Sequence, residues 1–258
     1  MKKNCYIIGS AIVTDTSQGY DVADRWMATL ATVDSINARD RNAEIFILET
    51  GSKKCPAWMD DRFPKNVKIY NWQFDSRVNE IRAESKQYGD LLSSKYSIKG
   101  KDKEFTKRFL WTAYIKSATE SYAILKFFQM HDLSEYDKVF KISGRYILNN
   151  EFDLSNYENK WTFKHQATLS DGTENISSVM WCFRGEHEKE FKQKWKNTYN
   201  WLVDAWKIRH ECKDLESSIH HGFGNTDEER QFTFIKPLGV MGIVNSPDKE
   251  EKLKIVAQ

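Results

Sequence analysis

Short apolar runs alternate with a helical pattern in the first 72 residues, and this alternation constrains the fold more than any other feature. The runs indicate buried strands and cover residues 5–13, 44–49 and 67–72. Between the first two, residues 22–38 carry apolar side chains at helical spacing. A strand, a helix and a second strand within about 45 residues predict a βαβ unit, which builds parallel sheets with right-handed crossovers.

The remainder of the chain mixes strand and helix patterns. The predicted elements after residue 72 are, in order, an ambiguous polar segment at 75–100, a long helix at 104–131, strands at 137–146, 161–167 and 177–184, helices at 186–209 and 214–221, and a final strand or loop at 232–244. No repeat, low-complexity tract or linker rich in Pro, Gly and Ser divides the 258 residues. We therefore expect a single α/β domain with a mixed, mostly parallel sheet flanked by helices.

Composition narrows the class of protein further. Apolar residues make up 40% of the chain and charged residues 29%, as in a folded globular protein, and the net charge of +2 indicates no strong polyanion partner. Four cysteines lie far apart without a Cys-x-x-Cys pair, which argues against a zinc ribbon or a redox motif. The first apolar run is short for a membrane span or a signal peptide, so we expect a cytoplasmic protein without a transmembrane segment.

The fourth predicted strand runs directly into Ser143-Gly144-Arg145-Tyr146, and its end is the strongest candidate for a ligand site. In open α/β sheets, ligands bind outside the carboxyl ends of the strands. A glycine there lets the backbone approach a ligand closely, and a guanidinium binds phosphate through two donors. Lys141, Ser143 and Arg145 would share one face if the strand stays extended to Arg145. An ordinary strand end with a surface arginine is the alternative.

In its order of elements the chain resembles GT-A-type nucleotide-sugar glycosyltransferases, in particular the small bacterial and phage-type enzymes with SGRY in place of the usual Asp-x-Asp. The features that carry the resemblance are, in chain order, Asp24-Arg25 and Thr32-Val33-Asp34-Ser35-Ile36 in the first helix, Leu48-Glu49-Thr50-Gly51-Ser52, Phe140 to Tyr146 after the long helix, Leu215-Glu216 with Ile219-His220, and Leu238-Gly239-Val240-Met241-Gly242. The resemblance implies one GT-A-like domain, in which residues 1–150 bind the nucleotide sugar and residues 151–258 bind the acceptor. The chain has neither Gly-x-Gly-x-x-Gly in its first strand nor a Walker sequence, which argues against unrelated nucleotide-binding folds.

The resemblance also implies which residues contact the donor. The implied nucleotide-sugar-binding residues are Ser10, Ala11, Arg25, Glu49, Gly51, Lys141, Ser143, Gly144, Arg145 and Tyr146. Glu49 would read the nucleobase edge or the ribose hydroxyls, with a cap or an exposed loop acid as the alternative. Most such enzymes hold a divalent metal, Mg or Mn, through Asp-x-Asp, and the departure at Ser143-Gly144-Arg145 argues against a metal here. A fixed guanidinium can stabilise the same developing charge, so we expect Arg145, helped by Lys141, to do part of the metal's work.

Transfer with inversion requires a carboxylate that deprotonates the acceptor hydroxyl, and two acids are candidates. The resemblance puts an acidic residue near the acceptor at Glu216, for which a structural helix acid is the alternative. Asp171 lies in a predicted turn at 170–173 and reads more simply as turn chemistry, so it ranks second. With Arg145, these two acids make up the expected catalytic residues.

The expected reaction is transfer of a sugar from a nucleotide-diphosphate sugar to a hydroxyl acceptor, in the first place a surface glycan. A phage-encoded relative could instead act on hydroxymethylated DNA bases, and the Lys-rich segment at 95–108 is the local indication for that alternative. A non-catalytic nucleotide- or sugar-binding module is a further alternative, which the absence of Asp-x-Asp keeps open.

Overall fold

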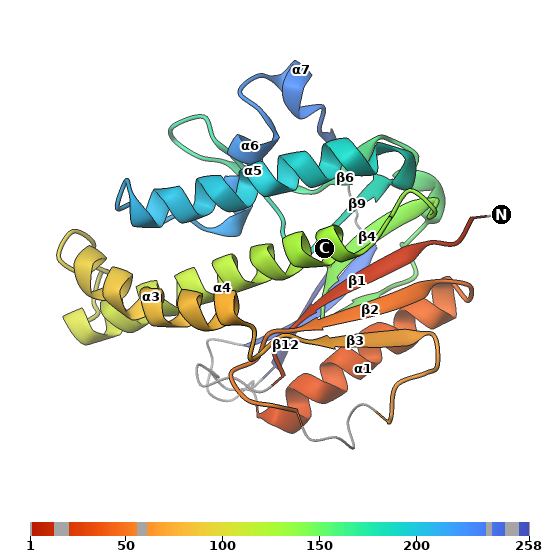
Figure 1. Cartoon of the computed structure of the whole chain (residues 1–258), viewed down its shortest axis with the longest axis horizontal. Coiled ribbons are helices and arrows are strands. Elements are labelled where there is room, and N and C mark those ends of the chain that lie inside the picture. The colour runs from red at the N-terminus through yellow and green to blue at the C-terminus, as the bar shows by residue number, and fades with distance from the viewer. Residues whose placement is uncertain (1, 13–20, 56–60, 236–238, 246–252, 258) are drawn as a thin grey trace.

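A seven-stranded sheet forms the centre of the molecule (Figure 1). The computed structural model describes residues 2–12, 21–55, 61–235, 239–245 and 253–257. The strand order is β10-β6-β9-β4-β1-β2-β3. The bounds of these strands are β1 Cys5–Ser10, β2 Glu44–Glu49, β3 Val67–Asn71, β4 Lys138–Ser143, β6 Trp161–Phe163, β9 Met180–Arg184 and β10 Thr233–Phe234.

Most neighbouring strands of this sheet run parallel. β4, β1, β2 and β3 are parallel to one another, and β10 is parallel to β6, whereas β9 lies antiparallel between β4 and β6. β1 and β2 are covered on both faces, which explains why their central residues form continuous apolar runs rather than alternating ones. The predicted mixed, mostly parallel sheet is therefore confirmed.

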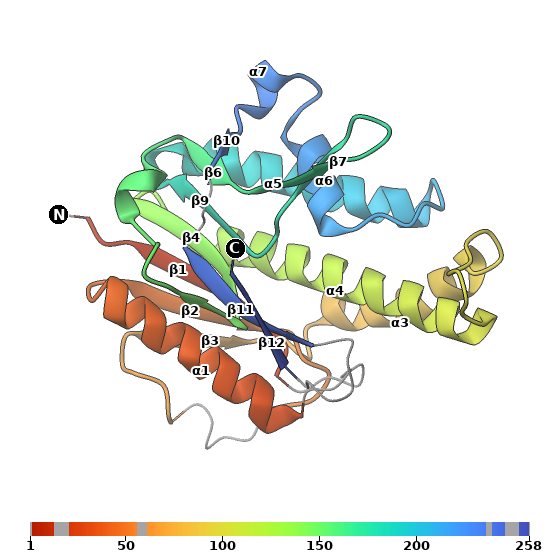
Figure 2. The same ribbon diagram turned by 180° about the vertical axis from the view of Figure 1, so that it is seen from behind.

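Helices cover both faces of the sheet. Their bounds are α1 Val22–Arg39, α3 Ser76–Leu92, α4 Lys103–Met130, α5 Glu188–Lys207, α6 Leu215–Phe223 and α7 Asp227–Arg230, with 3₁₀ turns at Leu154–Tyr157 and Gly185–His187. In Figures 1 and 2, α1 lies on one side of the sheet and α4 and α5 lie on the other. No helix among the described residues is both long and apolar enough to cross a membrane.

Alternate side chains of β1 build the two cores on either side of the sheet. Tyr6 and Ile8 belong to a buried cluster that includes Val33 of α1. Cys5 and Ile7 belong to the opposite cluster, which contains side chains of α4, α5 and α6. The sheet is thereby fixed between α1 and the longer helices, and the carboxyl ends of its strands are left at one edge.

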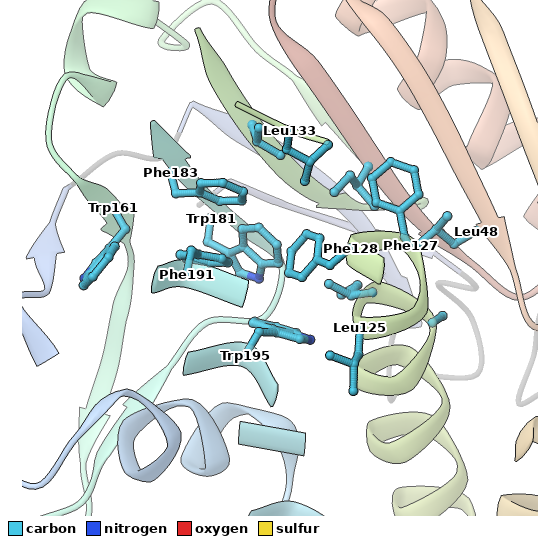
Figure 3. Packing of buried hydrophobic residues seen from close by; sticks show 14 of the residues in the cluster. Leu48, Leu125, Phe127, Phe128, Leu133, Trp161, Trp181, Phe183, Phe191 and Trp195 are labelled. Atoms are coloured by element: carbon cyan, nitrogen blue, oxygen red, sulfur yellow. The ribbon is translucent and has the colours of Figure 1, made fainter. Parts of the chain in front are cut away.

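The second core is built largely from aromatic rings (Figure 3). Phe191 of α5 stacks on Phe183 of β9 with ring centroids 4.1 Å apart, and Trp181 lies 4.9 Å from Trp195. Among the described residues, Trp161, Trp181 and Trp195 of this core have no exposed surface, and neither has Trp206, which packs in a separate cluster with α3 and α4. The richness in tryptophan therefore serves packing, because buried rings contribute large apolar area and favourable edge and stacked contacts.

Two predicted strands are each divided in the structure. The strand predicted at 137–146 ends at Ser143, and β5 (Tyr146–Leu148) joins a separate sheet with β11 (Val240–Asn245) and β12 (Leu253–Ala257). The strand predicted at 161–167 likewise ends at Phe163 of β6. The chain then forms a hairpin of β7 (His165–Thr168) and β8 (Glu174–Ile176), whose side chains are largely exposed on β7.

The ambiguous polar segment at 75–100 contains a full helix, α3. Asp75 caps it, since its carboxylate accepts hydrogen bonds from the backbone N–H groups of Arg77 and Val78. The predicted helix at 214–221 is α6, a separate helix capped by Asp214 rather than a continuation of α5. Val13, at the end of the strand predicted at 5–13, and residues 236–238, within the strand or loop predicted at 232–244, lie outside the described residues.

Candidate functional site

A cavity of about 780 Å³ opens at the carboxyl ends of β1 and β4. Its walls come from the residues that follow β1, β2 and β4, from the first turns of α1, from α3 and from one face of α4. This volume lies within the range of small-molecule sites, and the position is the one where open α/β sheets bind ligands. Seven of the implied donor-binding residues line it, namely Ser10, Ala11, Arg25, Gly51, Ser143, Gly144 and Arg145.

Gly144 ties the ends of β1 and β4 together at the floor of the cavity. Its N–H donates to the carbonyl oxygen of Gly9 over 2.9 Å, and its own carbonyl accepts from the Thr29 hydroxyl over 3.2 Å. A Cβ at this position would lie 3.2 Å from Gly9 O, Ile8 Cγ2 and Thr29 Oγ1. Close packing of the two strand ends therefore favours a glycine at this position of the Ser-Gly-Arg-Tyr sequence.

Arg145 lines the cavity from a turn rather than from a strand. The N–H of Arg145 donates to the carbonyl oxygen of Ser143 over 2.8 Å, which turns the chain immediately after β4. The expectation that Lys141, Ser143 and Arg145 share one strand face is therefore wrong for Arg145. It holds for the first two, since Lys141 Nζ lies 3.0 Å from Ser143 Oγ.

Lys141 lies beneath the cavity and does not line it. Its side chain is fully buried, and its ammonium contacts the Ser178 carbonyl, the Ser143 hydroxyl and the carboxylate of Glu120. Three acceptors match the three N–H donors of a lysine. Its donors are all used within the protein, so this structure gives no support to the expected contact between Lys141 and a phosphate.

Glu120 is the acidic residue that the sequence did not indicate. It lies on α4, pairs with Lys141 and is the one carboxylate among the described residues that line the cavity. About 17% of its side chain is exposed, so the carboxylate is reachable from the cavity. Lys116 precedes it by four residues on the same helix face, but helical spacing alone does not distinguish this pair from the other polar residues of α4.

Cations dominate the remaining charge of the cavity wall. The basic residues that line it are Arg25, Arg82, Lys86, Lys116 and Arg145. Two of them also hold the wall in place. Arg25 Nη1 donates to Ala11 O over 2.9 Å, and Arg82 donates to the carbonyl of Thr50 over 2.8 Å. Five cations against one carboxylate create a positive potential that suits a multiply charged anion.

Glu49 and Tyr146 do not line the cavity. Glu49 is buried and accepts hydrogen bonds from the backbone N–H groups of Ile12, over 3.0 Å, and Gly51, over 2.7 Å. Burial raises the pKa of its carboxyl, and these bonds offset part of that effect. The carboxylate holds the loops after β1 and β2, so this structure gives no support to its expected role as a reader of the nucleobase.

Tyr146 belongs to the core on the α1 side of the sheet. Its ring packs so closely on Gly242 that a Cβ there would lie 2.2 Å from the Tyr146 ring. This side chain packs β5 against β11, so the structure gives no support to the expected donor contact of Tyr146.

Glu216, at the start of α6, is separated from the cavity by Ser178 and Lys141. Its Oε1 accepts a hydrogen bond from the Ser178 hydroxyl over 2.5 Å, and the carbonyl of Ser178 contacts Lys141. Burial raises the pKa of Glu216, while the charge of Lys116, which lines the cavity, acts in the opposite direction. Glu216 therefore lies within electrostatic reach of the cavity wall without lining it.

Asp171 lies in the exposed turn between β7 and β8. Its carboxylate accepts a hydrogen bond from the backbone N–H of Thr173 over 2.9 Å, and this contact lowers its pKa. Lys213 lies 3.8 Å away. The residue does not line the cavity, and its observed contacts are those of turn chemistry.

The donor set at the end of β4 does not fit a divalent cation. Ser143, Gly144 and Arg145 stand there, and the nearby carboxylate of Glu120 is already paired with Lys141. Within the described part of the chain, no three His, Cys, Asp or Glu side chains gather closely enough to hold a metal.

Comparisons with known proteins support the fold. The sequence matches no known family profile and no curated protein. The structure of core-mannan synthase A from Aspergillus fumigatus, in its Mn/GDP form, superposes on 93% of this chain and 74% of its own, with a TM-score of 0.53 and 8% identity. The galactosyltransferase LgtC, solved with donor and acceptor sugar analogs, covers 92% of this chain and 85% of its own, with a TM-score of 0.43 and 10% identity. The chain therefore has the predicted GT-A fold over most of its length.

Proposed function

We propose that the protein is a glycosyltransferase that moves a sugar from a nucleotide-diphosphate sugar to a hydroxyl acceptor. The observation that carries the proposal is the cation-lined cavity at the carboxyl ends of β1 and β4. A diphosphate carries at least two negative charges at neutral pH, so it complements a wall with five cations and one acid. The fold similarity to a structure solved with GDP agrees with this reading.

Arg145 would stabilise the diphosphate as it leaves. It lines the cavity beside Gly144, whose backbone joins the ends of β1 and β4. A guanidinium stays charged at every physiological pH and donates to two phosphate oxygens at once. Arg25, from the first turns of α1, would add a second charge on the same anion.

Glu120 would bind hydroxyl groups of the donor. A carboxylate accepts hydrogen bonds from the paired hydroxyls of a ribose or a hexose, whereas it repels phosphate. Its contact with buried Lys141 holds the carboxylate in place at the cavity wall. The single acid in a basic cavity would thereby orient the neutral part of the donor.

Glu216 would be the base that deprotonates the acceptor. Its raised pKa makes it a stronger proton acceptor than an ordinary carboxylate. The pKa of Asp171 is lowered, and its carboxylate is occupied by a turn, so it is the weaker candidate. In this assignment residues 1–150 serve mainly the donor and residues 151–258 the acceptor, for which we propose a glycan.

Thermal stabilisation by nucleoside diphosphates tests the proposal. UDP, GDP, ADP, CDP and TDP would each be added with and without EDTA, because a ligand that binds only the folded state raises the melting temperature. We expect one base to give a shift that survives EDTA. A shift that EDTA abolishes would contradict the role given to Arg145, and no shift with any of the five would contradict the donor site.

The variant Arg145→Ala tests whether Arg145 binds the diphosphate of the donor. Losing a charge-assisted bond to phosphate should weaken diphosphate binding by about 10- to 100-fold. The matched control is Arg41→Ala, an exposed arginine in the turn before β2. Slow hydrolysis of the donor sugar, present in the control and lost in Arg145→Ala, would separate an enzyme from a module that only binds.

A further inference from the structure

The turn between α3 and α4 projects away from the body of the molecule (Figures 1 and 2). α3 ends at Leu92 and α4 begins at Lys103, so the two helices form a hairpin whose end lies beyond the sheet. We call residues 91–109 the hairpin tip. Only the part of α4 that follows the tip contributes to the cavity wall, so the tip has no role in the site described above.

The hairpin tip carries the positive excess of the chain. It contains six lysines and arginines against two acids, an excess of four, whereas the whole chain has an excess of two. The basic residues of the tip are Lys95, Lys99, Lys101, Lys103, Lys107 and Arg108. Of these, Lys107 is paired with Asp90 over 2.8 Å. The two acids, Asp102 and Glu104, lie at the start of α4, where Asp102 caps the helix.

Large apolar side chains are exposed among these charges. Four of the ten large hydrophobic residues exposed in the described part of the chain lie in the tip. They are Leu91, Tyr96, Phe105 and Phe109, each between 39% and 49% exposed. Lys101 Nζ lies 5.0 Å from the centre of the Phe105 ring. A lysine-rich surface with interspersed apolar side chains is the composition of segments that bind membrane interfaces.

The exposed rings continue the face of α4 that lines the cavity. Phe105 and Phe109 are four residues apart, and Thr112 and Lys116 follow at spacings of three and four on the same helix face. Thr112 and Lys116 line the cavity, whereas Phe105 and Phe109 lie beyond it. A surface that contacts the rings would therefore lie at the outer end of the cavity wall.

We propose that the hairpin tip docks on the surface of an anionic lipid bilayer. Lysines of the tip contact lipid phosphates, and Phe105 and Phe109 enter the headgroup region, where their rings leave water. Charge alone would also attract nucleic acid. Leu91 is an exposed aliphatic side chain. Contact with a nucleic-acid phosphate backbone would not bury it in apolar surroundings, whereas the boundary between the lipid headgroups and the acyl chains would. The binding does not depend on the donor site, and it would hold the cavity close to acceptors carried in the membrane.

Vesicle cosedimentation of the full chain tests the proposal without any assay of activity. We expect binding to vesicles rich in phosphatidylglycerol, little binding to vesicles of phosphatidylcholine alone, and weakening at high salt. Lys99→Glu with Lys103→Glu should weaken binding at least about tenfold. The matched control is Lys189→Glu with Lys196→Glu, which makes the same change in net charge on the exposed face of α5.

The apolar part of the contact has its own test. Phe109→Ser should weaken binding to the anionic vesicles several-fold, whereas Phe74→Ser, at a more exposed phenylalanine outside the tip, should not. Unchanged melting temperatures would show that each variant is folded. Equal loss in the tip and control variants, or no binding of the wild-type chain to anionic vesicles, would overturn the proposal. Binding to duplex or single-stranded DNA in place of vesicles would overturn it in favour of a nucleic-acid surface.

Discussion

The ammonium of Lys141 contacts the carboxylate of Glu120 directly beneath the candidate donor cavity. Lys141 is fully buried, and Glu120 is the one acid among the described residues of the cavity wall. The lysine thus has two effects. It compensates the charge of the largely buried Glu120, and through the carbonyl of Ser178 it links the cavity to the segment that holds Glu216.

Lys141→Met should destabilise the fold strongly. It leaves the carboxylate of Glu120 without its counter-charge in a mostly buried site, a change that typically costs about 3 to 5 kcal/mol. Urea unfolding of the variant measures the loss. Lys141→Met combined with Glu120→Gln should lose less than Lys141→Met alone, because no uncompensated charge remains. Equal losses in the single and double variants would mean that the pair is not coupled.

Glu120→Gln should weaken donor binding about tenfold while the fold persists. The amide oxygen can still face Lys141, but a neutral acceptor binds hydroxyls less strongly than a carboxylate. Isothermal titration with the nucleoside diphosphate and with its 2′-deoxy and 3′-deoxy forms measures the effect. The wild type should prefer the ribose form and the variant should lose that preference, whereas Glu135→Gln, an exposed acid, should keep it. If Glu120→Gln kept the ribose preference, Glu120 would not contact the ribose. A donor with a deoxygenated sugar would then test whether Glu120 contacts the transferred sugar instead.

Gly144→Ala should destabilise the protein by about 1 to 3 kcal/mol and weaken ligand binding. The added methyl group would lie 3.2 Å from backbone and side-chain atoms of β1 and α1, so these neighbours must shift by a few tenths of an ångström. Gly9→Ala is the matched comparison. Its Cβ would meet its nearest neighbour, Glu120, at an ordinary 3.5 Å, and it should cost less in thermal unfolding. A smaller loss in Gly144→Ala than in Gly9→Ala would contradict the packing argument.

As the pH is lowered, the rate of transfer should fall with an apparent pKa above that of an ordinary carboxyl group. Glu216 must be ionised to accept a proton, and burial raises its pKa above the usual value of 4.5. The pH dependence of kcat/KM shows this limb. Glu216→Gln should abolish it together with most of the activity, whereas Asp171→Asn should leave it unchanged. An acid limb at or below 4.5 would argue for a different base.

The same carboxyl predicts a pH dependence of stability. The pKa of Glu216 is higher in the folded state than in the unfolded state. Its contribution to the free energy of unfolding is therefore fully present at pH values below the unfolded-state pKa, and it is lost as the pH rises through the folded-state pKa. The melting temperature of Glu216→Gln, measured relative to the wild type, should therefore rise over that interval. A difference between the two proteins that does not vary with pH would show that Glu216 is not buried as described.

The position of the cavity could be predicted from the sequence. The end of an apolar run marks the end of a strand, and ligands of open α/β sheets bind at the carboxyl ends of the strands. The runs that end near Ser10 and Ser143 indicated one edge of the sheet, and both residues line the cavity. The turn at Arg145 could not be predicted, because the backbone bond that makes it depends on how Gly144 packs on β1.

The partners of buried charges also escaped prediction. Glu49 and Lys141 stand at or near strand ends, where a charged side chain indicates a ligand contact when only the sequence is known. In the fold, Glu49 instead accepts two backbone N–H groups, and Lys141 meets an acid from a helix. Helical spacing predicted α4 but gave no reason to choose Glu120 over the other polar residues along it.

α4 contributes to three regions of the molecule, namely the aromatic core, the cavity wall and the exposed hairpin tip. It has 28 residues, which makes it about 42 Å long at the usual rise per residue. Phe127 and Phe128 anchor one end in the aromatic core, Lys116 and Glu120 form the cavity wall, and Phe105 lies at the exposed end. Leu110, Tyr114 and Ala118 of the same helix are buried against α3 and α5. One continuous, packed helix therefore joins the hairpin tip to the charged wall of the cavity.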